Sequence, residues 1–128
     1  MQYNTRVTSA IIQIGGVGIW IPLAMTGGYT AGAVAPAITL LPDGTLAFRG
    51  ILITRPAPAS GDLCMQGPTN LVPTATRALS VMTLTNPNAL LQLNFNTDGS
   101  FQIFGGGPNP PGNTNISLDN IAAVPVAF

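Results

Sequence analysis

Glycine and proline interrupt this chain so often that long helices are hard to accommodate. The 128 residues include 15 glycines and 12 prolines, spread along the chain rather than clustered. Proline breaks helices and glycine inside a helix is unfavourable, so few uninterrupted helical stretches remain. The sequence therefore predicts an all-β protein with a single folded domain.

Segments rich in Val, Ile, Leu, Thr and Phe recur between these breaks, as is typical of strands. Turn signals separate them at short spacing, which suggests an all-β sandwich or barrel, and we expect a single, jelly-roll-like β-sandwich. Two stretches rich in Gly and Pro, 55–73 and 105–115, are expected to be loops. The expected strands are 20–25, 37–41, 46–54, 79–85, 90–95, 101–104 and 121–128.

One local pattern occurs twice, in residues 38–50 and 93–105, which align without a gap. Each copy has an Asp-Gly pair between two runs in which every second residue is apolar. Asp-Gly accepts the positive φ angles of a tight primed turn, and the alternation gives each ribbon one buried face. We therefore predict two β-hairpins in equivalent settings. One hairpin in each sheet would meet this expectation. The turn-forming residues are Asp43, Gly44, Asp98 and Gly99.

Charge is scarce, and this excludes several classes of function. Only 6% of residues are charged, against about 25% in typical soluble domains. All are Arg or Asp, and four scattered arginines cannot build a nucleic-acid-binding face. Without His, Lys or Glu most acid–base groups are missing, and no His can activate Cys64. We expect no catalytic residues, no enzyme activity and no cofactor.

The remaining polar groups suggest structural roles. One cysteine excludes an internal disulfide and a zinc cluster, and no clustered oxygens suggest calcium, so no metal site is expected. Cys64 is expected to be a small packed residue and Asp62 a solvated loop residue. Asp119 is expected to cap a turn. Arg49 and Arg55 are expected to pair with Asp or carbonyl groups at the rim of the domain.

The uncharged run 10–25 does not predict a membrane span. It is shorter than the roughly 20 residues that a spanning helix needs, and it is broken by glycines and Pro22. It also lies too far from the start, and is too interrupted, for a signal peptide. We therefore expect no membrane partner.

With so few charges, much of the exterior must be neutral or covered. We favour a subunit that hides surface against copies of itself, and the alternative is a neutral β-protein with a Thr/Asn-rich surface. Residues 1–18 are expected to form an N-terminal strand or assembly arm and 19–128 the knob. The arm either reaches a neighbour or pairs within its own sandwich. Trp20 and Tyr29 flank a glycine-rich segment, and we favour their burial over stacking on a sugar. Candidate assembly contacts are Arg6, Ile11, Ile12, Trp20 and Tyr29.

The order of features from Trp20 to Phe128 resembles the C-terminal head or knob domain of tailed-phage tail fibres and related virion surface proteins. It runs from Trp20 through a glycine-rich turn to a first Asp-Gly hairpin that ends in Phe48-Arg49-Gly50. A proline-rich loop, a second Asp-Gly hairpin and the ending 116–128 follow. The resemblance implies a compact β-sandwich that assembles as a trimer.

Because Met1 lies shortly before the domain, we expect a free-standing capsid decoration (cement) protein that stabilises the shell as a homotrimer on the virion surface. The alternative is the receptor-binding tip domain of a phage tail fibre. Both interpretations are non-enzymatic. The expected partners are further copies of the chain and other virion proteins, either the major capsid protein or tail proteins.

Overall fold

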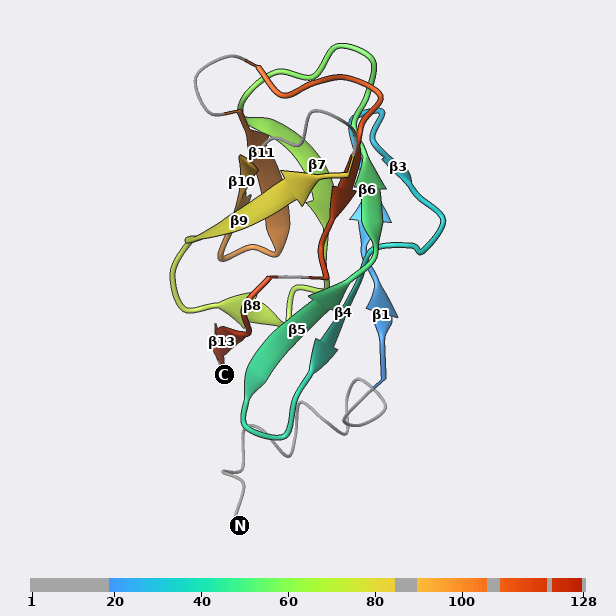
Figure 1. Ribbon diagram of the computed structural model, residues 1–128. Coiled ribbons are helices and arrows are strands. Elements are labelled where there is room, and N and C mark those ends of the chain that lie inside the picture. Colours follow the sequence, from blue (N-terminus) through green and yellow to red (C-terminus); the bar gives the residue numbers. More distant parts are fainter. Residues whose placement is uncertain (1–18, 85–89, 106–108, 120, 128) are drawn as a thin grey trace.

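Two antiparallel sheets make up the fold in the computed structural model, which describes residues 19–84, 90–105, 109–119 and 121–127 (Figure 1). No helix occurs in these ranges, and the all-β sandwich prediction is confirmed. One sheet has the order β1 (Ile21–Pro22), β4 (Ala37–Leu40), β5 (Thr45–Arg49), β13 (Val124–Ala127) and β8 (Val72–Pro73). The other has the order β2 (Ala24–Met25), β7 (Asp62–Gln66), β11 (Ser100–Phe104), β10 (Leu90–Phe95), β9 (Arg77–Thr83), β12 (Asn115–Ser117), β6 (Ile51–Ile53) and β3 (Thr30–Ala31).

The two predicted hairpins are present, one in each sheet. β4 pairs with β5 in the five-stranded sheet, and β10 pairs with β11 in the eight-stranded sheet. The matching apolar positions of both copies all point into the core, because the side chains of a strand alternate between its two faces. These buried residues are Ile38, Leu40, Leu46 and Phe48 in the first hairpin and Leu93, Phe95, Phe101 and Ile103 in the second.

The turns differ from the predicted primed type. Gly44 and Gly99 have positive φ angles of 84° and 87°, whereas Asp43 and Asp98 do not. In the first turn the Gly44 N–H donates to the Leu41 carbonyl and the Leu41 N–H donates to the Thr45 carbonyl. This is a three-residue loop, in which a turn of ordinary handedness is followed by a left-handed glycine. The primed-turn prediction was wrong. A primed turn would need positive φ at the aspartate as well, whereas the observed three-residue loop needs it only at the glycine.

The expected strand 46–54 is two strands in different sheets. β5 ends at Arg49 and β6 begins at Ile51, and Gly50 between them has a φ of 107°. A Cβ on Gly50 would collide with the backbone of Ala35 and Pro36. The chain therefore crosses between the sheets at Gly50, where a residue with a side chain would not fit.

The segment 55–73 is only partly a loop. Its centre forms β7, which pairs with β11 on one side and β2 on the other, with an irregularity opposite Phe101 and Gln102. β8 follows near its end. The expectation of one long loop was wrong because β7 is short and lies between glycines and prolines that dominate the local pattern.

The second expected loop, 105–115, is anchored where the structure describes it. Thr54 Oγ1 donates to the Pro111 carbonyl at 2.7 Å and accepts from the Thr114 N–H at 2.9 Å. Pro110 and Thr114 are buried, so the segment does have side chains that fix it by burial. In Figure 1 this segment runs beside the one after β6 at the upper end of the molecule.

Candidate binding surface

The four turn residues hold the hairpin ends together. Asp43 Oδ1 accepts from the Thr45 N–H and hydroxyl at 3.1 and 2.7 Å, and Asp98 Oδ1 accepts from the same groups of Ser100 at 2.9 and 2.6 Å. The hydroxyl hydrogen bonds lower the pKa values of both carboxyls. Each carboxylate therefore serves its own turn, and nothing in this geometry points to catalysis.

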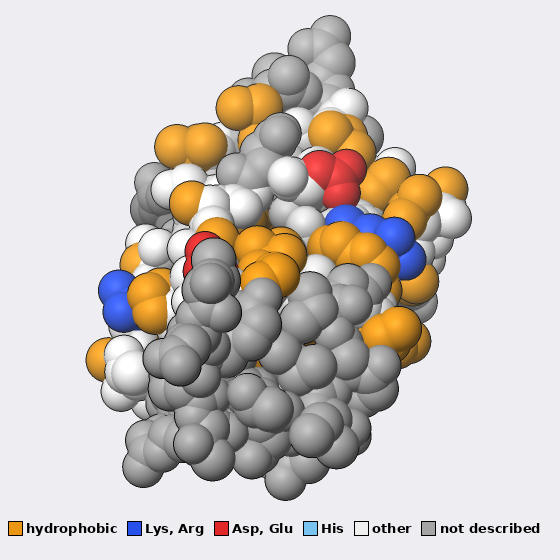
Figure 2. All heavy atoms as spheres, turned by 90° about the horizontal axis from the view of Figure 1, so that it is seen from below, with side chains coloured by type: hydrophobic (Ala, Val, Ile, Leu, Met, Phe, Trp, Pro, Cys, Tyr) orange, Lys and Arg blue, Asp and Glu red, His pale blue; other side chains and the backbone are white. Residues whose placement is uncertain are grey.

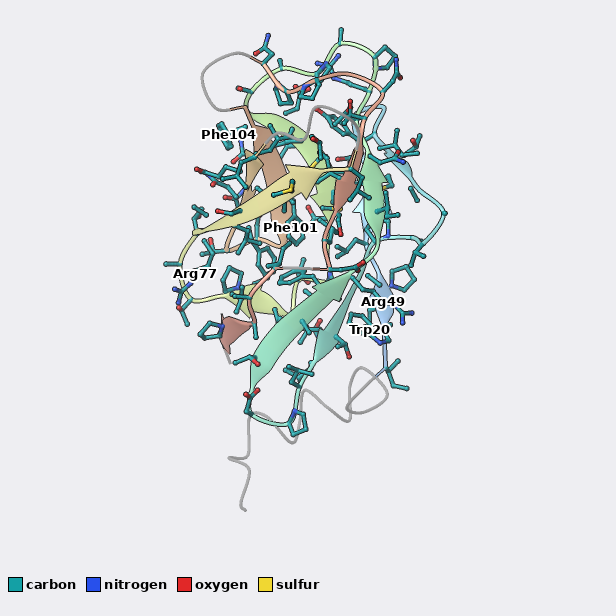
Figure 3. The ribbon with its side chains drawn as sticks, viewed as in Figure 1. Trp20, Arg49, Arg77, Phe101 and Phe104 are labelled. Carbon is teal, nitrogen blue, oxygen red and sulfur yellow. The ribbon has the colours of Figure 1, made fainter. Side chains whose placement is uncertain are left out.

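Trp20 and Arg49 form a cation–π pair on the five-stranded sheet. The Arg49 guanidinium carbon lies 4.4 Å from the centroid of the Trp20 ring, and Figure 3 shows the two side chains next to each other. Trp20 is only partly buried and Arg49 is exposed. We expected Arg49 to pair with an Asp or a carbonyl group. Its partner is instead Trp20, which lies far earlier in the chain.

Tyr29, which precedes β3, Arg55, which follows β6, and Asp62, which begins β7, form a second cluster. Asp62 Oδ2 accepts from the Tyr29 hydroxyl at 2.9 Å, from Arg55 Nε at 2.8 Å and from the Ala59 N–H at 2.9 Å. The pairing expected for Arg55 is confirmed. The expectation that Asp62 is a solvated loop residue was wrong, because its carboxylate joins three segments of the chain. The burial of Tyr29 is confirmed, since its ring is 3% exposed.

The contacts within this cluster shift the pKa values of its members away from neutral pH. The Arg55 hydrogen bond, followed by that of Ala59, lowers the pKa of Asp62 to about 2. Burial, assisted by the hydrogen bond to Asp62, raises the pKa of Tyr29 well above its ordinary value. Neither group is poised to exchange a proton near neutral pH.

Cys64 and Asp119 are also used structurally. The Cys64 side chain is completely buried, as expected, and burial raises the pKa of its thiol to about 12. Asp119 Oδ1 accepts from the Gly50 N–H at 3.0 Å and so fixes the sheet-to-sheet crossing. Among the described residues no three His, Cys, Asp or Glu side chains gather as metal ligands, and no helix there is long and apolar enough to cross a membrane.

The outer face of β10 and β11 carries a cluster of neutral amides, which we call the amide face: Gln92, Asn94, Asn96 and Gln102. Gln92 Nε2 donates to Asn94 Oδ1 at 2.7 Å, and Asn96 Nδ2 donates to Gln102 Oε1 at 3.1 Å. Phe104 lies opposite Gln92 in the register, on the outer side of the sheet, while Phe101 points into the core (Figure 3).

The amide face can recognise a neutral polar ligand. Each amide offers two N–H donors and a carbonyl acceptor. Asn96 and Gln102 also bond to Thr76, Ser100 and Gly61, whereas the bond between Gln92 and Asn94 uses one donor of the first and the acceptor of the second, so these two side chains have the most capacity for a ligand. An aromatic ring beside the amides adds an apolar contact surface. The alternation of polar and apolar residues in 90–95 and 101–104 indicates that these side chains lie on the outer face. We predicted no binding site from this pattern.

The candidate assembly contacts separate into two groups. Trp20 contacts Arg49 and Tyr29 contacts Asp62, so the two aromatic residues belong to separate clusters. Arg6, Ile11 and Ile12, together with the whole expected arm 1–18, fall outside the described residues.

Comparison with known proteins supports the fold. No family model matches the sequence, and no curated protein matches it. Among solved structures, the crystal structure of the receptor binding protein (gp15) of Listeria phage PSA superposes with a TM-score of 0.69 at 15% sequence identity, covering 91% of this chain and 70% of that chain. At this identity the likeness establishes the β-sandwich fold alone.

Proposed function

We propose that the chain is the receptor-binding tip domain of a phage tail fibre, assembled as a homotrimer and exposed on the tail. The observation that carries this proposal is the superposition on a phage receptor-binding protein over 91% of the chain. Because the match spans nearly the whole chain, it concerns the complete sandwich and not a shared hairpin.

The amide face supports recognition of a neutral, polar receptor such as a host-surface glycan. Gln92 is exposed, and Asn94 and Gln102 are half-buried on the same side of the sheet. A sugar presents hydroxyl groups that both donate and accept hydrogen bonds, and amides match both roles. A charged receptor would find no oppositely charged side chain on these two strands, because β10 and β11 contain no charged residue.

The capsid decoration protein that the sequence favoured is the weaker hypothesis. It depended on the position of Met1, and the superposed structure is that of a receptor-binding protein. Nothing in the described residues favours a shell site over a tail site.

Location on the particle distinguishes these two roles. We would raise an antibody against the knob and label intact particles of the phage that encodes it for electron microscopy. A tail tip predicts gold at the tail end and a handful of copies per particle by quantitative mass spectrometry. Gold over the whole shell with hundreds of copies would support decoration and overturn the proposal.

Receptor binding is tested separately with the purified protein on host cells. Gln92→Ala removes an exposed amide group and Asn94→Ala a half-buried one on the outer face, and neither changes the core. We expect each to weaken binding by roughly tenfold, which corresponds to the loss of about 1.4 kcal/mol. Thr30→Ala is the control, because Thr30 is exposed on β3, four strands away from β10. Equal binding by all four proteins would remove the amide face from the proposal.

A further inference from the structure

Three exposed apolar side chains form a patch at one end of the eight-stranded sheet. Met82 is 48% exposed, Leu84 52% and Leu90 64%. Leu90 lies directly opposite Met82 in the β10–β9 register, and Ser117 of β12 lies opposite Met82 on the other side. We call Met82, Leu84 and Leu90 the apolar patch. Large side chains on the solvent side of a sheet mark an interaction surface when they adjoin one another in this way.

The patch lines a groove that can receive a side chain. The groove measures about 180 Å³ and is bordered by the patch residues together with Ser80, Val81 and Ser117. An apolar cavity of about 150 Å³ holds a benzene ring, so the groove has room for one large aliphatic side chain. The two serines supply a polar border, which is the usual composition of an interface with an apolar centre.

The face around the patch contains almost no charge. β10, β11 and β12 have no charged residue, and the only one in β9 is Arg77 at its far end. Figure 2, which views the molecule from below, shows small groups of charged side chains among hydrophobic and neutral ones. Surfaces that bind a partner are depleted in charged residues at their centre.

A neutral face is suited to meeting its own copy. Around a symmetry axis each residue near the axis faces the same residue of the next subunit, so a charged residue would face a like charge. The patch and its serine border avoid this repulsion completely. The electrostatics therefore favour a second copy of this chain as the partner.

The sheet edges favour contact through a face over contact through an edge. In the described part of the chain, both sheets end in strands of only two residues, and Pro22 and Pro73 lie in two of them. Short edges and prolines discourage a neighbour from adding a strand. Association through the apolar patch does not need a free edge.

We infer that the apolar patch packs against a second copy of this chain near the symmetry axis of the homotrimer, with Leu90 of each copy filling the groove of the next. This inference rests on the assembly part of the proposed function and names the surface that carries it. Leu90 and Gln92 lie on the same face of β10, so Gln92→Ala is also sedimented. Normal association with lost cell binding in that variant separates receptor binding from the contact between copies.

Sedimentation of the full chain tests the inference. At micromolar concentration we expect a multiple of 13.1 kDa for the parent protein and 13.1 kDa for Leu90→Asp and Met82→Asp. Val34→Asp is the matched control, because Val34 is 52% exposed and lies in the connection between β3 and β4. A monomeric parent, or aspartate variants that associate like the parent, would overturn the inference. Association retained in both variants together with lost cell binding would assign the patch to the receptor instead.

A cysteine variant keeps the test decisive if an aspartate variant does not fold. Leu90→Cys is treated with a short bismaleimide, and Cys64 does not interfere because it is completely buried. We expect covalent pairs from Leu90→Cys and none from Val34→Cys. An associated Leu90→Cys protein that gives no covalent pairs would show that the patch does not meet its own copy, and would overturn the inference.

Discussion

Phe48 on β5 stands edge-on against Phe95 on β10, with ring centroids 5.7 Å apart and ring planes at 88°. Phe48 makes the same kind of contact with Phe101, at 6.1 Å and 90°, while Phe95 and Phe101 are stacked at 4.4 Å. Edge-to-face and offset-stacked pairs are the favourable arrangements of aromatic rings. This triad joins the two equivalent hairpins, and therefore the two sheets, across the core.

Phe48→Ala should lower the free energy of unfolding by about 3–5 kcal/mol, the usual cost of truncating a buried phenylalanine. The reason is a cavity between the sheets that the stacked pair cannot fill without moving apart. Urea denaturation followed by circular dichroism measures the loss. Phe104→Ala is the control, because Phe104 is only half-buried on the outer side of β11. A cost for Phe48→Ala no larger than that of Phe104→Ala would argue against the triad as the joint between the sheets.

The hairpins could be predicted because their signals are local. Within the strands of both hairpins every second residue is apolar and buried on the expected face, and the Asp-Gly pairs lie in the turns. β7 could not be predicted in this way, because its pairing with β11 depends on a segment far along the chain.

The same distinction separates the sites. The amide face follows from strand alternation, because Gln92 and Asn94 occupy outward positions of a strand that was expected. The cluster at Asp62 does not, because Tyr29 lies 33 residues before Asp62 and only the fold brings them together. The crossing at Gly50 likewise depends on tertiary contacts with Ala35 and Pro36.

Gly99→Ala should destabilise the protein more than Gly61→Ala. Both glycines have positive φ angles, 87° and 94°, where other residues are strained by roughly 1–3 kcal/mol. A Cβ on Gly99 would also lie 3.0 Å from Gln66 Nε2 and 3.1 Å from the Gly67 carbonyl oxygen, whereas one on Gly61 would meet Phe104 at an ordinary 3.8 Å. Thermal and urea denaturation of the two variants measure the difference. Equal losses would show that the neighbours of Gly99 move aside freely.

Stability should fall in acid in a manner that depends on Asp62. Its carboxyl titrates near 3.9 in the unfolded chain and at about 2 in the folded protein. The folded state therefore binds this proton less tightly, and the stabilisation is present above about pH 4 and lost as the pH falls towards 2. We expect the difference in unfolding free energy between the parent and Asp62→Asn to be largest above about pH 5 and to shrink towards pH 2. Curves that stay parallel over this range would contradict the role of the Arg55 pair.

Cys64 should be inert in the native protein. Its pKa of about 12 leaves almost no thiolate near pH 8, and its side chain is completely buried. Ellman's reagent should therefore label no thiol in the folded protein within hours and one thiol per chain after denaturation. Rapid labelling of the native protein would mean that β7 opens readily, and would also require Cys64 to be replaced before the Leu90→Cys cross-linking.

Arg49→Gln should expose the Trp20 ring to water without unfolding the protein. The guanidinium lies over the ring at 4.4 Å, and a cation–π contact at an exposed site contributes about 0.5–1 kcal/mol. Trp20 is the only tryptophan, so its fluorescence reports on this contact alone. For Arg49→Gln we expect emission at longer wavelength, stronger quenching by acrylamide and a small loss of stability. Arg49→Lys should lie between the parent and Arg49→Gln, because lysine keeps the charge but not the planar group. Unchanged emission and quenching in Arg49→Gln would mean that other groups cover Trp20 and that Arg49 is free to contact a partner.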